Sequence, residues 1–199
     1  LLASSAASDV YKRQALMLLC VFVVSSCKDD DDDTEAVERE AYKLEQDIAF
    51  QAKVNETGFK KWNSEAGDGY VFAKLIKKGD GKQAYFNSLV SVYYKGSLTD
   101  GTVFDQQLFD DGIPFPCAVS PYYAKTVTDP VTNSQTKYGS VISGWTVALQ
   151  HMVEGDKYEV WIPQQLAYGA SESGDIPAYS TLIFEIELVS VDEQAASAS

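Results

Sequence analysis

The chain has 199 residues, of which 45% are hydrophobic, and carries a net charge of −13. A chain of this length can bury one core. The acidic balance argues against a nucleic-acid partner, because phosphates attract basic surfaces. Twelve tyrosines, nine phenylalanines and three tryptophans are typical of a packed, β-rich domain and argue against a disordered chain.

The first part of the chain, residues 1–26, is predicted to be an export signal. A basic pair at residues 12–13 precedes the apolar run "ALMLLCVFVV", which is followed by two serines and Cys27. Such a run has the length of a secretory signal peptide and is too short to span a membrane. The first 14 residues show no initiating methionine and no usable pattern, and one interpretation is a sequence-assembly artefact.

The cysteine after the two serines resembles the end of a bacterial lipobox. We therefore expect Cys27 to carry lipid and to become the mature N-terminus; a plain secretory signal with an incidental cysteine is the alternative. Residues 27–33, "CKDDDDD", have two interpretations: a surface-export signal like that of lipoproteins in one Gram-negative phylum, or a solvated tether. Either makes the chain an outer membrane lipoprotein, facing the periplasm or the cell surface.

The other cysteines and the single histidine predict no disulfide, metal or cofactor. Cys20 would leave with the signal, so Cys117 remains alone and is expected to be a small buried hydrophobe. His151 has no partner at metal-ligand spacing, which also argues against a histidine-dependent triad.

A helix is predicted over residues 34–54, capped by Thr34. Its apolar stripe could pack on the main domain or on a second copy of the chain. The stripe consists of Val37, Ala41, Leu44 and Ile48. Residues 55–69 are polar and punctuated by glycine, and are expected to join this helix to the next domain.

From residue 70 the pattern changes to strands. Apolar and polar residues alternate in segments typical of half-buried strands, namely 70–76, 89–98, 157–163 and 182–191. Among them, "VISGWTVALQHM" places Trp145, Leu149 and Met152 on one helix face. One short helix among such strands predicts an α+β domain with an antiparallel sheet around the helix. Spacing alone makes Trp145 a core residue.

Four segments of this domain carry a family resemblance. They are "VSVYYKGSLTDGTVFDQ", "SVISGWTVALQHMVEGDKYEVWIP", "AYGA" and "IPAYSTLIFEIEL". In this order they resemble FKBP-type peptidyl-prolyl isomerases over residues 70–192, which leaves 193–199 as a tail. The resemblance implies an FKBP-like fold: a bent antiparallel β-sheet wrapped around one short α-helix, with a hydrophobic pocket between them.

The resemblance also assigns the pocket residues. Those expected to act in catalysis are Tyr94, Phe104, Asp105, Ile142, Trp145 and Tyr168. Those expected to bind substrate are Phe115, Val141, Ile176 and Phe184. Trp145 would be the floor beneath a proline ring, and an indole can serve as floor and core at once. The Ile142 N–H and the Tyr168 hydroxyl would hold the carbonyls beside the proline. Asp105 would orient neighbouring groups. A purely structural core role does not suit it, since a carboxylate beside Phe104 is costly to bury unpaired.

The implied activity is rotamase activity, rotation of X-Pro bonds in exported polypeptides without covalent chemistry. An apolar pocket would favour the twisted transition state, which is less polar than either planar isomer. The expected partners are proline-containing polypeptides, macrolide pocket ligands and a membrane reached through the lipid anchor. One alternative is a non-catalytic FKBP-like binding module or chaperone; another is a structural lipoprotein with a vestigial pocket.

Three departures from the family pattern favour the first alternative. Cys117 stands where another aromatic residue is usual, which would leave one side of the pocket roomier. Asp175 stands where a second aliphatic residue often sits, in the loop after Tyr168. Residues 120–139 form a long insertion whose turn formers predict an added hairpin beside the pocket.

Overall fold

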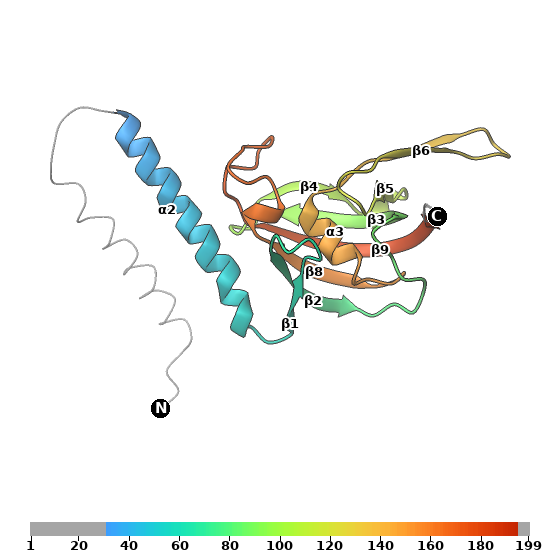
Figure 1. Ribbon diagram of the computed structural model, residues 1–199, viewed down its shortest axis with the longest axis horizontal. Coiled ribbons are helices and arrows are strands. Elements are labelled where there is room, and N and C mark those ends of the chain that lie inside the picture. Colours follow the sequence, from blue (N-terminus) through green and yellow to red (C-terminus); the bar gives the residue numbers. More distant parts are fainter. Residues whose placement is uncertain (1–30, 195–199) are drawn as a thin grey trace. The chain divides into compact units, whose positions relative to one another are not determined.

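The computed structural model describes residues 31–194 (Figure 1). The chain divides into two units, residues 1–39 and 40–199. The predicted signal peptide, the predicted lipidation site Cys27 and most of the acidic tether lie outside the described residues, as do residues 195–199 of the predicted tail. Among the helices of residues 31–194, none is long and apolar enough to cross a membrane.

The N-terminal helix α2 (Asp31–Gln51) begins before the predicted cap, so Thr34 lies inside it, and the short η1 (Ala52–Asn55) follows. From residue 40 onward the helix belongs to the larger unit. The predicted stripe does not pack there, because Leu44 and Ile48 remain 55% and 52% exposed. A neighbouring face that includes the buried Gln46 and Phe50 is covered instead.

The main sheet is antiparallel, with strand order β1-β2-β8-β9-β3-β4, and β5 also pairs with β3. Its strands are β1 (Phe59–Asn63), β2 (Tyr70–Lys77), β3 (Ser88–Ser97), β4 (Val103–Gln107), β5 (Phe115–Ala118), β8 (Lys157–Ile162) and β9 (Leu182–Gln194). The four strands predicted from alternation are confirmed. Residues 55–69, expected to join the helix to the domain, also contain the edge strand β1, which was not predicted; two exposed lysines, Lys60 and Lys61, obscure its pattern.

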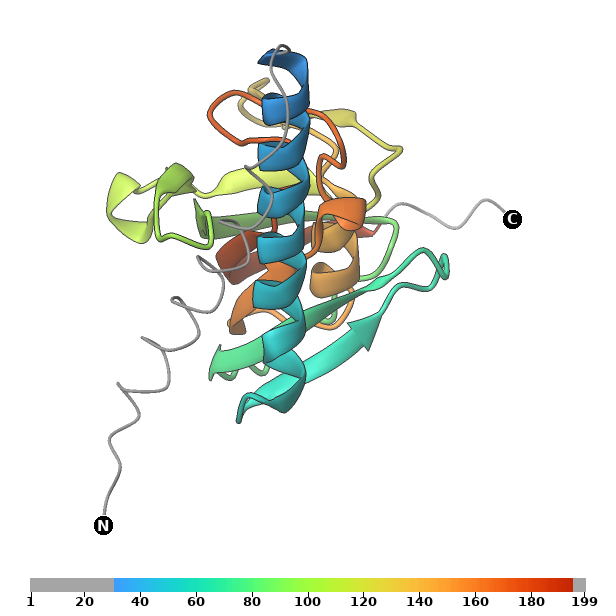
Figure 2. The same ribbon diagram turned by 90° about the vertical axis from the view of Figure 1, so that its left-hand side faces the viewer.

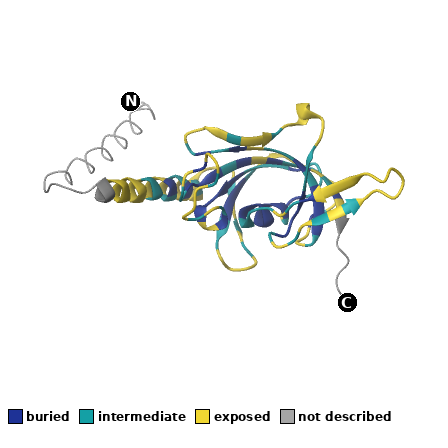
Figure 3. Ribbon diagram, turned by 90° about the horizontal axis from the view of Figure 1, so that it is seen from above, coloured by how far each residue is buried: buried dark blue, intermediate teal, exposed yellow. Residues whose placement is uncertain are grey.

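The short helix α3 (Ser143–Leu149) lies against the inner side of the sheet, where buried residues gather (Figure 3). Trp145, Leu149 and Met152 are all buried, as their spacing predicts. Gly144 permits this close packing, since a Cβ there would lie 2.2 Å from Cγ2 of Ile162 on β8. The α+β, FKBP-like architecture is therefore confirmed.

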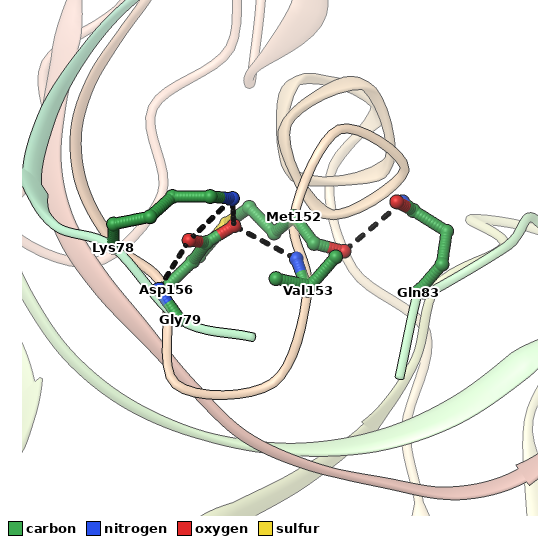
Figure 4. A network of polar contacts seen from close by, with 6 residues as sticks. All are labelled: Lys78, Gly79, Gln83, Met152, Val153 and Asp156. Atoms are coloured by element: carbon green, nitrogen blue, oxygen red, sulfur yellow. Dashed lines mark hydrogen bonds and ion pairs between the residues drawn. The ribbon is translucent and has the colours of Figure 1, made fainter. Parts of the chain in front are cut away.

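A network of polar contacts holds the turn after α3 (Figure 4). The buried carboxylate of Asp156 accepts hydrogen bonds from Lys78 Nζ at 3.0 Å, the Gly79 N–H at 2.7 Å and the Val153 N–H at 2.9 Å. Gln83 Nε2 donates to the Met152 carbonyl at 3.0 Å. The loop before β3 is thus tied to the segment that ends α3, which fixes the helix relative to the sheet.

The predicted insertion is a hairpin of β6 (Lys125–Thr128) and β7 (Gln135–Tyr138), which form a separate two-stranded sheet. Tyr138 at its base packs with Leu89 and Ala118. The remaining short elements are η2 (Phe109–Asp111), after β4, and η3 (Gln164–Leu166), after β8. Residues 139–142 join this hairpin to α3.

Candidate active site

Aromatic side chains from several elements meet around a pocket of about 360 Å³ between the sheet and α3. Strands β3, β4, β5 and β9 supply Tyr94, Phe104, Phe115 and Phe184, and α3 supplies Trp145. The other lining residues are Asp105, Ser140, Val141, Ile142 and Tyr168. Inward-facing residues of a strand alternate with outward-facing ones, which is why single positions from neighbouring strands converge here.

The floor of this pocket is the indole of Trp145. It is only 4% exposed and meets the rings of Tyr94 and Phe184 edge to face, at 5.1 and 5.2 Å between centroids. Its N–H is buried and has no hydrogen-bond acceptor among the described residues, an arrangement that costs about 1–3 kcal/mol. Trp145 is therefore both a core residue and part of the pocket lining.

Gly96 makes room for the aromatic wall. A Cβ at this position would lie 2.6 Å from the ring of Phe104 and 2.7 Å from that of Phe184. The two rings stand edge to face at 5.5 Å between centroids. The sequence analysis did not single out Gly96. The only signal was its position inside a predicted strand, where a glycine often marks a place at which another group packs closely against the backbone.

At the rim, the Tyr94 hydroxyl donates a 2.6 Å hydrogen bond to Oδ2 of Asp105. Burial of the phenol, followed by this bond, raises the pKa of Tyr94 above its usual range. Asp105 is an exposed residue that β4 carries at the mouth of the pocket, so its carboxylate is not buried unpaired in the core. The bond fixes the Tyr94 ring against the floor.

Two further donors remain available at the pocket. The Ile142 carbonyl accepts from the N–H of Trp145 and Thr146, while no hydrogen bond within residues 31–194 uses the Ile142 N–H. The Tyr168 hydroxyl, on a residue 41% exposed, also has no partner in the described part of the chain. Groups of this kind can bind the carbonyl oxygens of a peptide.

A smaller cavity of about 230 Å³ lies over the outward-facing residues of β3, including Tyr93 and Lys95. Its wall contains the ion pair between Lys157 and Glu185, at 2.9 Å. Charged groups make it unsuited to an apolar ring. Within residues 31–194, no group of three His, Cys, Asp or Glu side chains could hold a metal ion.

Comparison with known proteins identifies the family. The family model described as FKBP-type peptidyl-prolyl cis-trans isomerase matches residues 81–189. The chain belongs to this family. It is 35% identical over 164 residues to the FKBP-type peptidyl-prolyl cis-trans isomerase FkpA of Aeromonas hydrophila, covering 82% of this chain and 51% of that one. It is 32% identical to the peptidyl-prolyl cis-trans isomerase FKBP15-2 of Arabidopsis thaliana, covering 75% and 81%.

Solved structures of FKBP-type isomerases show the same fold. A peptidyl-prolyl cis-trans isomerase from Pseudomonas syringae pv. tomato matches with a TM-score of 0.60 and 31% identity, over 77% of this chain and 96% of that one. FkpA from Escherichia coli matches with a TM-score of 0.54 and 27% identity, over 92% and 83%. The chain spans about half the length of the first curated relatives it matches, at 51% and 54%.

The structure brings nine of the ten assigned FKBP pocket residues together. Ile176 does not line the pocket; it lies in the loop that follows Tyr168, with its side chain buried in the core. Ser140, which precedes the assigned pair Val141 and Ile142, was missed, and only its adjacency to them could have indicated it. The catalytic and binding roles of these residues stay predictions.

Two of the residues that depart from the FKBP pattern do not line the pocket. Cys117 is fully buried on β5, opposite Val90; that the missing aromatic side chain leaves one side of the pocket roomier stays a prediction. Burial raises the pKa of the Cys117 thiol to about 12, which agrees with a small buried hydrophobe. Asp175 is exposed and does not line the pocket.

Proposed function

We propose that the protein catalyses cis–trans rotation of X-Pro peptide bonds. The observation that carries this is the aromatic pocket over Trp145, with Tyr94, Phe104 and Phe184 as walls and the two unused donors beside it. Its volume of about 360 Å³ falls within the range of small-molecule sites and is ample for a pyrrolidine ring. Membership of the isomerase family supports the same conclusion.

The proposed mechanism uses no nucleophile. A planar peptide bond resists rotation with a barrier of about 18–20 kcal/mol, because resonance gives the C–N bond double-bond character. Twisting removes that resonance and lowers the charge separation between oxygen and nitrogen. A pocket walled by aromatic rings solvates this less polar state better than water does, and so binds it in preference to either isomer.

The polar groups would position the substrate. The Ile142 N–H and the Tyr168 hydroxyl would each bind a carbonyl oxygen next to the proline, holding the chain while one bond turns. Asp105 would act through Tyr94, whose ring its hydrogen bond fixes. Macrolides would bind in the same pocket and compete with peptide.

A protease-coupled assay on short X-Pro peptides tests this proposal. The full chain should accelerate isomerisation beyond the spontaneous reaction, which takes about tens to hundreds of seconds. Phe104→Ala should lose most of that acceleration. Phe86→Ala, an exposed aromatic that does not line the pocket, is the matched control and should keep it. Absence of acceleration across several residues before proline would exclude the proposal.

The alternative of a non-catalytic binding module is motivated by the insertion and by Cys117 and Asp175, two departures from the family pattern that do not themselves line the pocket. A holdase should suppress aggregation of an unfolded protein equally well as wild type and as Phe104→Ala. An isomerase should lose peptide turnover with that change. Measuring both activities on the same two proteins separates the two functions.

We propose that the protein works outside the cytoplasm as an outer membrane lipoprotein anchored through Cys27, and that exported proteins with X-Pro bonds are its substrates. The sequence "SSCKDDDDD" supports this, as does 37% identity over 123 residues to a protein of Legionella longbeachae named outer membrane protein MIP. Cys27→Ser should abolish lipidation and release the protein from the membrane fraction. Protease treatment of intact cells would then distinguish a surface-exposed from a periplasm-facing domain.

A further inference from the structure

The loop between η3 and β9, residues 167–181, carries Tyr168 and is closed by its own hydrogen bonds. The Tyr179 N–H donates a 2.7 Å hydrogen bond to the carbonyl of Gly169, the residue that follows Tyr168. Nearer the tip, Ser173 and Ile176 exchange two backbone hydrogen bonds at 3.0 Å, and the Ile176 side chain is buried in the core. The position of Tyr168 therefore depends on where Tyr179 is held.

Tyr179 has an unfavourable backbone conformation. Its φ of +65° lies in the left-handed region, which a bulky residue rarely adopts. Such a conformation costs on the order of 1–3 kcal/mol and persists only where the surroundings hold it. The contacts that hold Tyr179 and the two residues after it are therefore the ones that fix this side of the loop.

Those contacts come from helix α2, which passes the loop in both Figure 1 and Figure 2. Tyr42 hydrogen-bonds Ser180 Oγ at 2.8 Å, and because the Ser180 hydroxyl already donates to the Pro177 carbonyl, Tyr42 is the donor. The side-chain Oε1 of Gln46 accepts a hydrogen bond from the Thr181 N–H, and the backbone carbonyl of Gln46 accepts one from the Thr181 hydroxyl, both at 3.2 Å. Lys43 Nζ lies 5.2 Å from the Tyr179 ring centroid.

The face of α2 that is buried shows that the contact between α2 and the loop does more than extend the hydrophobic core. A helix that only extended the core would bury its apolar stripe, yet Leu44 and Ile48 stay exposed while Gln46 is 2% exposed. The side chain of Gln46 also exchanges hydrogen bonds with Thr99 in the turn after β3. The buried face of α2 thus presents polar groups matched to the loop.

We propose that α2 positions the substrate-binding loop, with Tyr42 and Gln46 as positioning residues that act on Tyr168 through Tyr179 and Gly169. This inference rests on the proposed isomerase function for its effect on turnover, but not for its effect on the loop. Removing the hydroxyl of Tyr42 and the amide of Gln46 deletes the two side-chain hydrogen bonds that hold Ser180 and Thr181. It keeps the bond from the Thr181 hydroxyl to the Gln46 backbone carbonyl and leaves every pocket residue unchanged.

The test compares the full chain with the double variant Tyr42→Phe/Gln46→Leu, and uses Leu44→Ala, on the exposed face of the same helix, as control. Amide hydrogen exchange should rise about tenfold in residues 168–181, because two hydrogen bonds that hold this loop are removed, and stay unchanged in β9. The control should show neither change. Tyr42→Phe alone, which deletes one oxygen atom, should show a smaller rise in the same residues.

Peptide turnover distinguishes a positioning role from a merely structural one. The kcat/KM for an X-Pro peptide should fall about three- to tenfold in the double variant, and the fall should vanish in a Tyr168→Phe background, as expected of residues that act through one hydroxyl. An unchanged exchange rate in the loop, or a fall of equal size in the Tyr168→Phe background, would overturn the inference. If the wild type has no turnover, the proposed function fails, while the exchange measurement still decides the role of α2.

Discussion

Replacing Trp145 by leucine separates the two roles of the pocket floor. The indole is 4% exposed, so nearly all of its surface, about 150–250 Å² for a buried aromatic side chain, is removed from water. Leucine would bury roughly 80 Å² less, which corresponds to about 2 kcal/mol at about 25 cal/mol per Å². The domain should remain folded, because such a loss is smaller than the usual stability of a domain, about 5–15 kcal/mol.

Two other contributions nearly cancel. Loss of the edge-to-face contacts with Tyr94 and Phe184 removes about 1–3 kcal/mol in total. Loss of the indole N–H, which has no acceptor among the described residues, returns about 1–3 kcal/mol. Trp145→Leu should therefore lower the free energy of unfolding by about 2 kcal/mol, as measured by denaturant unfolding, and should reduce kcat/KM because the surface under the proline ring changes shape.

Fluorescence gives an independent assay. The chain has three tryptophans, and Trp145 is the one that lines the pocket. A proline-containing peptide or a macrolide should change the emission of the wild type but not that of Trp145→Leu. Trp62→Leu, which removes an indole stacked on His151 at 4.7 Å, should retain the response. A response that persists in Trp145→Leu, or turnover that is unaffected by this change, would refute the assignment of Trp145 as the floor.

Four further outcomes follow from the structure. Gly96→Ala should cost about 1–3 kcal/mol of stability and lower turnover, because its Cβ would press on two pocket rings; unfolding and peptide assays measure both. The raised pKa of Tyr94 stabilises the folded state below about pH 10, the usual value for the unfolded chain, and this contribution is lost as the pH rises through the folded-state pKa. The unfolding free energy should thus fall more steeply above pH 10 in the wild type than in Tyr94→Phe, and equal slopes would contradict this. Replacing the hairpin tip, residues 128–135, by a short turn should leave turnover of a short X-Pro peptide unchanged, because none of these residues lines the pocket; lost turnover would show that the tip contributes to catalysis. The buried thiol of Cys117, with its pKa raised to about 12, should resist a thiol reagent at pH 8 until the domain unfolds, as mass mapping of the labelled peptide would show; labelling of the folded domain would contradict its burial.

The sequence alone determined four strands of the main sheet, the short helix and most of the pocket. Alternating residues in β3 and β9 report which side of each strand is buried, because side chains point to opposite faces in turn. The spacing of Trp145, Leu149 and Met152 does the same for α3. Family resemblance then selected ten positions, and the structure places nine of them around one pocket.

Tertiary structure decided which neighbours those residues have. The bond between Asp105 and Tyr94, the burial of Ile176, and the space that Gly96 leaves for Phe104 and Phe184 all depend on how distant segments pack. The docking face of α2 is a further example. Its apolar stripe is the strongest local pattern, yet the surface it meets offers Thr181 and Ser180 as partners, so Gln46 and Tyr42 are covered while Leu44 and Ile48 face solvent. Periodicity gives the faces of a helix, but only the partner surface decides which one is buried.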